Sequence, residues 1–355
     1  MNNLSFTRVT HKQAEAIITT ALKANVVPFF TGAPAVGKSS LIASIAKKAN
    51  LELLDVRLTQ LQPYDLAGLI SPLKNEEGQN EIATYLPVDI FPYEHTELPA
   101  GKDGFLLFLD EFNSADRYTL AAAYKLILDR AVGKHKLHPN TRIVTAGNRV
   151  TDGAIASALP SALQSRVIHL ELDMDSKEWV ENYLNYQTDW NSIVKSYLNY
   201  RPSSVCNFPD DPKTKITFAS PRTWEFLSKM LNNSPKDISK EILQVVVAGA
   251  VGQDVLNDFM AFYDTYGSLP TIQEIMADPH NARLPDSPSA QWALGLFLAD
   301  HVTKENAPTL ITYMERVEAA DIRIMGYRAM KLTCPDIAMV QELKDALVKT
   351  ARMLA

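Results

Sequence analysis

The chain has 355 residues, of which 46% are hydrophobic and 21% are charged, and its formal net charge is −6. This balance is typical of a globular protein, and the length allows two domains. No apolar run reaches the about 20 residues that cross a bilayer, and Met1–Phe6 lack the charged and apolar stretches of a signal peptide. We therefore expect a cytoplasmic protein without a membrane contact, whose cysteines, Cys206 and Cys334, are reduced thiols.

The first predicted elements surround a phosphate-binding loop. A helix is expected over 11–24 and a short apolar strand over about 26–31, and a helix follows the loop over about 38–48. The loop between them reads G-x-x-x-x-G-K-S. In such a loop, backbone N–H groups at a helix N-terminus surround phosphate oxygens, the lysine (Lys38) reaches the β- and γ-phosphates, and the serine (Ser39) ligates Mg²⁺. The sequence therefore predicts an ATP site, whose lining residues are expected to be Gly32, Ala33, Pro34, Ala35, Val36, Gly37, Lys38, Ser39 and Ser40.

A less regular segment follows the second predicted strand, which covers 51–58. Residues 71–104 contain four prolines and a turn signal at 75–80. A compact domain rarely uses a bare connection of this length, which favours a functional insert over an ordinary surface loop.

The next strand carries the acidic half of the site. Residues 105–109 are all apolar, which is typical of a strand buried on both faces, and Asp110 and Glu111 follow them directly. Ligands of open α/β sheets bind at the carboxyl ends of the strands. We expect Asp110 to hold Mg²⁺ and Glu111 to take a proton from an attacking water. This pair indicates hydrolysis rather than transfer of a phosphoryl group to a small molecule.

The remaining pattern changes from mixed to helical. A helix is expected over 114–130, a small hairpin over 131–138, and strands over 141–149 and 167–172. Beyond residue 172 the strand signals fade. Helices are expected over 177–184, around 192–199, and over 221–232, 237–251, 254–265, 289–302, 305–319 and 336–354, with a proline-rich connection between the fifth and sixth of them.

Four segments in this order resemble those of AAA+ ATPases, and more narrowly of the MoxR-like branch, including phage- and prophage-type members. They are Asp65-Leu66-Ala67-Gly68, 141–149, 159–166 and 219–224. The resemblance covers about residues 10 to 230. It implies an α/β fold, an αβα P-loop sandwich with a parallel five-stranded sheet, followed by an α-helical lid and a helical C-terminal extension. The expected domains are 1–172, 173–268 and 269–355, with a hairpin or helical insert in the 71–104 segment.

The resemblance also implies catalytic roles for three further residues. Asn148 would be sensor 1 and hold the attacking water, Arg166 would be an arginine finger that enters the neighbouring subunit's site, and Arg222 would be sensor 2 and close the lid. Simpler interpretations remain for each: a Gly-Asn turn, a surface arginine, and a helix start capped by Ser220. Arg149 is a weaker candidate for a second arginine that acts on a neighbour.

The implied function is a ring-forming, hexameric ATPase that uses ATP and Mg²⁺ to remodel a partner protein. In the MoxR-like branch that partner is a protein with a von Willebrand factor A (VWA) domain. Two other classes stay open. One is a DNA-acting motor, against which the negative net charge argues, although a local basic pore in an assembled ring would be compatible with it. The other is a nucleotide-gated assembly protein with little turnover, against which the pair Asp110 and Glu111 argues.

Overall fold

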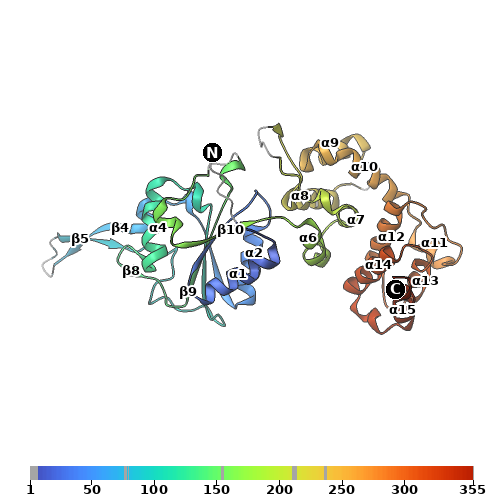
Figure 1. Ribbon diagram of the computed structural model, residues 1–355, viewed down its shortest axis with the longest axis horizontal. Coiled ribbons are helices and arrows are strands. Elements are labelled where there is room, and N and C mark those ends of the chain that lie inside the picture. The colour runs from blue at the N-terminus through green and yellow to red at the C-terminus, as the bar shows by residue number, and fades with distance from the viewer. Residues whose placement is uncertain are drawn as a thin grey trace. The chain divides into compact units, whose positions relative to one another are not determined.

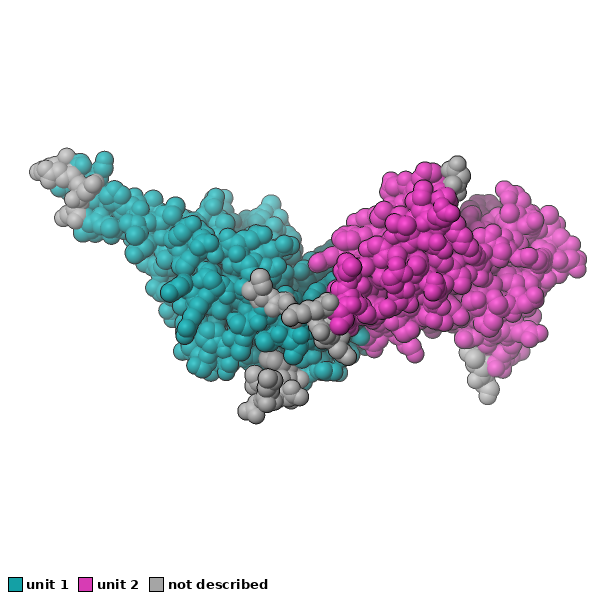
Figure 2. Space-filling model, turned by 90° about the horizontal axis from the view of Figure 1, so that it is seen from above, with its two compact units in different colours: residues 1–174, 210–213 teal, residues 175–209, 214–355 magenta. Residues whose placement is uncertain are grey.

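The computed structural model divides the chain into two compact units (Figures 1 and 2). Unit 1 comprises residues 1–174 and 210–213, and unit 2 comprises 175–209 and 214–355. The residues that the structure describes are 7–75, 78, 80–152, 156–209, 214–235 and 238–354. Within these ranges, every helix is too short or too polar to span a membrane.

Unit 1 is built on one parallel sheet. Its six strands, in spatial order, are β1 (Arg8–Val9), β10 (Val167–Leu172), β2 (Val27–Thr31), β9 (Thr141–Gly147), β6 (Gly104–Asp110) and β3 (Leu51–Arg57). Every neighbouring pair is parallel. Both faces of the central strands are covered, so β6 is apolar from Phe105 to Leu109 and all five residues of β2 are buried.

The sheet has one strand more than the five expected. The additional strand, β1, pairs Arg8 with Glu171 and Val9 with Leu172 at the edge of the sheet. Two residues are too few to produce a periodic apolar pattern, so this strand left no signal in the sequence.

Helices cover both faces of the sheet. Figure 1 shows α1 (His11–Lys23) and α2 (Lys38–Lys48) on one face and α4 (Arg117–Asp129) on the other. The short helices α3 (Pro63–Ala67) and α5 (Ser161–Gln164) complete the unit. The expected αβα sandwich is thus the observed fold.

The irregular segment after β3 contains a hairpin insert, formed by β4 (Leu69–Lys74) and β5 (Asn80–Leu86). It begins two residues before the predicted segment, and Figure 1 shows it extending beyond the rest of unit 1. Of the turn signal at 75–80, residues 76, 77 and 79 lie outside the described residues. Gly68 starts the hairpin with φ +92°, and a Cβ there would lie 2.6 Å from the carbonyl oxygen of Leu86. The second predicted hairpin is also present, as β7 (Ala131–Val132) and β8 (His135–Lys136).

The described residues of unit 2 form helices and no strands. The helices are α6 (Ser176–Asn182), α7 (Ser192–Tyr200), α8 (Pro221–Asn232), α9 (Lys240–Val251), α10 (Gln253–Gly267), α11 (Ile272–Ala277), α12 (Pro288–His301), α13 (Ala307–Met314), α14 (Ala320–Thr333) and α15 (Gln341–Leu354). Because α12 packs against α7 and α10, the predicted lid and extension belong to one compact unit. Their division at residue 268 stays a prediction.

Three features of unit 2 correct the sequence reading. The short helix α11 lies within the segment that was expected to be a proline-rich connection. The helix expected over 305–319 ends at Met314, and α14 follows it without having been predicted. Gly326 in α14 faces Gly295 in α12, where a Cβ on Gly295 would lie 3.3 Å from the Cα of Gly326. Glycine is unfavourable within a helix, and here it serves close packing between two helices rather than helix formation.

Candidate functional site

The phosphate-binding loop leaves the carboxyl end of β2 and enters α2. Gly37 adopts φ +90° and Ala35 adopts φ +62°, so the loop turns tightly before the helix begins at Lys38. The ring nitrogen Nε2 of His11 lies 2.8 Å from the carbonyl oxygen of Val36, which requires the proton on Nε2. The start of α1 therefore supports the loop, a contact that the sequence did not indicate.

Lys38 connects the loop to the neighbouring strand. Its ammonium donates to the carbonyl oxygens of Gly32 (2.9 Å) and Ala33 (3.1 Å) and to Oδ1 of Asn148 (3.2 Å). Asn148 directly follows β9, which lies between β2 and β6 in the sheet. The structure thus brings together two predicted site residues that are 110 positions apart.

The two residues expected to hold a metal also face each other. The hydroxyl of Ser39 donates to Oδ2 of Asp110 over 3.4 Å. A hydroxyl and a carboxylate are hard oxygen donors that suit Mg²⁺, which commonly takes one or two protein oxygens together with phosphate oxygens and waters. Burial and the neighbouring charge of Asp110 raise the pKa of Asp55, whereas Arg57 opposes this shift. The donor set therefore fits a phosphate-bound Mg²⁺.

Glu111 adopts an unusual backbone conformation beside Asp110. Its φ of +54° and ψ of 31° are left-handed, which is uncommon for a residue other than glycine. Its backbone N–H donates to Oδ1 of Asp110 over 2.8 Å, and its carboxylate accepts a hydrogen bond from the hydroxyl of Thr59. Thr59 follows β3, the neighbour of β6, and nothing in its local sequence distinguished it.

Asn113 fixes the backbone around Asn148. Only 3% of Asn113 is exposed, its amide donates to the carbonyl oxygen of Asn148 over 2.9 Å, and its Oδ1 accepts from the N–H of Asn148 over 3.2 Å. A Cβ at Gly147 would lie 2.0 Å from that Oδ1, so only glycine allows the approach. Sequence reasoning missed Asn113, whose only signal was a polar residue within a buried turn after the acidic pair.

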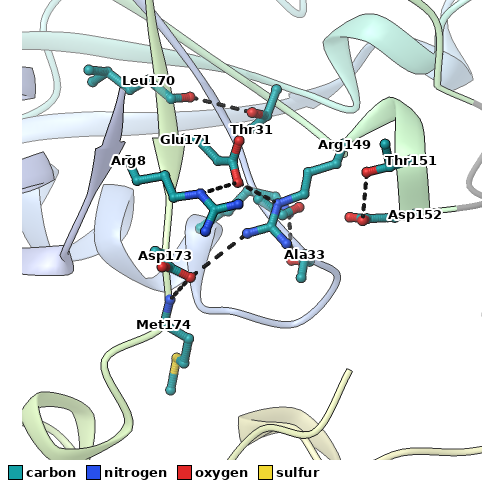
Figure 3. A network of polar contacts seen from close by, with 12 residues as sticks. Arg8, Thr31, Ala33, Arg149, Thr151, Asp152, Leu170, Glu171, Asp173 and Met174 are labelled. Carbon is teal, nitrogen blue, oxygen red and sulfur yellow. Dashed lines mark hydrogen bonds and ion pairs between the residues drawn. The ribbon is translucent and has the colours of Figure 1, made fainter. Parts of the chain in front are cut away.

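Arg149, the residue after Asn148, belongs to a charged network (Figure 3). Nε of Arg149 lies 3.0 Å from Oε1 of Glu171, and Nη2 of Arg149 lies 3.9 Å from Oδ1 of Asp173. Arg8 binds the same oxygen of Glu171 over 3.4 Å. Burial raises the pKa of Asp152, whereas the positive charges of Arg149 and Lys38 oppose the shift. Arg149, which the sequence suggested as acting on a neighbour, is therefore paired within its own chain.

Arg166 lies away from the phosphate-binding loop of its own chain. It precedes β10, and because β10 runs parallel to β2, it stands at the amino edge of the sheet whereas the loop stands at the carboxyl edge. The length of β10 makes that separation roughly 20 Å. Arg166 is exposed, and its guanidinium donates to the carbonyl oxygen of Ala162.

Arg222 belongs to unit 2, where it occupies the first turn of α8. The expected cap is present: the hydroxyl of Ser220 accepts from the N–H of Thr223 over 3.3 Å, and Pro221 opens the helix. The side chain of Arg222 is exposed. Its sensor role stays a prediction.

No protein-family model matches the chain. Among solved structures, the chain is similar to a RuvB mutant from Thermotoga maritima, with 20% identity, a TM-score of 0.37, and coverage of 70% of this chain and 67% of that one. It is also similar to NtrX from Brucella abortus, with 15% identity, a TM-score of 0.39, and coverage of 98% and 69%. For the ADP complex of that NtrX, the identity is 15% and the TM-score is 0.35, with coverage of 94% of this chain and 68% of that one. Likenesses at these scores do not determine a function, which depends on the residues of the site.

Proposed function

We propose that the chain is an ATPase of the AAA+ type, which hydrolyses ATP with Mg²⁺. The observation that carries this proposal is the meeting of Lys38, Asn148 and the pair Ser39 and Asp110 at the carboxyl edge of one parallel sheet. Phosphate binding, metal binding and water positioning each require one of these groups.

Each of these residues has a defined task in that reaction. The N–H groups of the loop and the ammonium of Lys38 would bind the phosphates, Ser39 and Asp110 would hold Mg²⁺, and Mg²⁺ would neutralise phosphate charge. Asn148 can accept and donate, so it can orient a water against the terminal phosphate. Glu111 would accept the proton of that water after its carboxylate leaves the hydroxyl of Thr59.

We further propose that the active form is a cytoplasmic ring, hexameric as in the MoxR-like branch, that remodels a partner protein with a VWA domain. The position of Arg166 supports shared sites, because an exposed arginine at the amino edge of the sheet cannot serve its own loop but can serve a neighbour's. Arg222 would close the lid over the nucleotide. The choice of partner rests on the resemblance alone.

The experiment that tests this function measures ATP turnover per subunit over a wide range of protein concentrations, with particle mass recorded in parallel. We expect the rate to rise together with the mass. A constant rate from a monomer would retain the ATPase but contradict the ring and the role of Arg166. Stimulation by duplex DNA would favour a DNA motor, and stable ATP-bound rings without phosphate release would favour an assembly protein.

A further inference from the structure

The side chain of Arg149 crosses the strand from which the phosphate-binding loop begins. Arg149 follows β9, in which Gly147 pairs with Thr31 of β2. Its partner Glu171 lies on β10 and pairs with the same Thr31 from the opposite side. The ion pair of 3.0 Å therefore joins β10 to the segment that follows β9, across Thr31 at the end of β2 (Figure 3).

This ion pair is better shielded than the other one at Glu171. Glu171 is 9% exposed, and the side chain of Arg149 is 25% exposed. Arg8 binds the same carboxylate over a longer distance with a side chain that is 70% exposed. Exposed ion pairs contribute little, whereas removal of one partner from a buried pair leaves an uncompensated charge. The contact with Arg149 is thus the better shielded charge pair at Glu171, although Nε of Arg149 approaches the carboxylate without the geometry of a hydrogen bond.

The restraint acts directly beside Asn148. Asn113 holds the backbone of Asn148 from the β6 side, and the next residue along the chain, Arg149, is anchored on the β10 side. Between these two anchors, Oδ1 of Asn148 contacts the ammonium of Lys38.

We propose that Arg149 is a positioning residue of the nucleotide site: by binding Glu171 across the end of β2, it fixes Asn148 against the phosphate-binding loop. This inference rests on the proposed ATPase function. Misplacement of a catalytic group by about 1 Å can lower a rate on the order of 100-fold. Arg149 makes no contact with the loop's phosphate-binding N–H groups in the proposal, so we expect nucleotide affinity to be retained in its absence.

The test compares two arginine variants that remove a partner from the same carboxylate. Arg149→Ala should lower kcat by about 10- to 100-fold, with the KM for ATP within about threefold of the wild-type value. Arg8→Ala is the matched control. It should change kcat by less than about twofold, because Arg8, unlike Arg149, is not next to Asn148 in the sequence. Melting temperatures of both variants separate positioning from a general loss of fold.

A double-mutant cycle tests whether the effect passes through Glu171. The variant Glu171→Ala should lose activity as Arg149→Ala does, and the double variant should be no slower than Arg149→Ala alone. Additive losses, equal losses in Arg8→Ala and Arg149→Ala, or a raised KM with unchanged kcat would overturn the inference.

Hydrogen exchange of the nucleotide-free protein provides a readout that is independent of turnover. The amide of Asn148 should lose protection in Arg149→Ala and keep it in Arg8→Ala. If the wild-type protein showed no Mg²⁺-dependent turnover, the proposed function would be wrong. Loss of protection at Asn148 in Arg149→Ala but not in Arg8→Ala would still support the positioning role. Unchanged protection in Arg149→Ala would contradict that role whether or not the protein hydrolyses ATP.

Discussion

At the scale of single residues, two catalytic side chains of the site are held by other groups of the protein. The ammonium of Lys38 donates hydrogen bonds to carbonyl oxygens of its own loop, and the carboxylate of Glu111 accepts a hydrogen bond from the hydroxyl of Thr59. Both groups must exchange these partners for phosphate and water.

The role of Glu111 can be tested by Glu111→Gln. An amide cannot accept the proton of the attacking water, so turnover should fall by about 10²–10⁴-fold. Binding of ATP should persist, because the loop and Lys38 are intact. Isothermal calorimetry and phosphate release measure the two effects separately, and wild-type turnover in this variant would remove Glu111 from the proposed role. Lys38→Ala is the reference that should lose binding itself.

Asp152 predicts a dependence of stability on pH. Burial raises its pKa above the ordinary value of 3.8, so the folded protein holds this proton more tightly than the unfolded chain does. Its contribution to stability is complete below pH 3.8 and is lost as the pH rises through the folded-state pKa. In Asp152→Asn, the free energy of unfolding from urea titrations should fall less across that window than in the wild type.

Asp116 provides a control of opposite sign for this prediction. Its hydrogen bonds with Thr119, followed by that with the N–H of Tyr118, lower its pKa, so its contribution is present above pH 3.8 and is lost as the pH falls through the folded-state pKa. The variant Asp116→Asn keeps a capping side chain for α4. If Asp152→Asn and Asp116→Asn changed the pH dependence of the free energy of unfolding in the same direction, the assignment to Asp152 would be contradicted.

At the scale of elements, the parts that could be predicted are those with a local signal. The phosphate-binding loop is recognised by its glycine spacing, and β6 is recognised by its apolar run. This kind of signal does not reveal Thr59, Asn113 or Glu171. The role of each depends on a partner that the fold brings in from another strand or its end. For the same reason, β1 depends on β10 for its existence, since two residues carry no pattern of their own.

The crossing of α12 and α14 gives a prediction on packing in unit 2. A Cβ on Gly326 would lie 2.8 Å from Cε of Met314 and 3.4 Å from the Cα of Gly295. Gly326→Val should therefore destabilise unit 2 by about 1–3 kcal/mol through overpacking. All four tryptophans of the chain lie in unit 2, so the shift can be followed in urea by tryptophan fluorescence.

A second helical glycine provides the control for that substitution. A Cβ on Gly249 in α9 would meet no atom within 4 Å. Gly249→Val should leave the urea midpoint unchanged or raise it slightly, since valine has the better helix propensity. Equal destabilisation by Gly249→Val and Gly326→Val would mean that close packing at the crossing is not the cause.

At the scale of the whole molecule, Arg166 predicts that sites are completed between chains. Arg166→Ala should lose turnover by a factor on the order of 10³–10⁵ if it acts as an arginine finger. Mixing this variant with Lys38→Ala subunits should restore part of the rate, because the first keeps an intact loop and the second keeps the arginine. The measurement is phosphate release from mixed rings whose composition is verified by mass. Absence of recovery in such rings would argue against action on a neighbour.

The interleaving of β9 between β2 and β6 also has a consequence for how unit 1 folds. The loop, Asn148 and Asp110 come from segments that are far apart along the chain, and none of them meets another until the parallel strands have paired. Pairings over such separations carry a high loop-closure cost and form slowly. Nucleotide binding should consequently appear late in refolding, as a signal that the central strands of unit 1 have reached their native register.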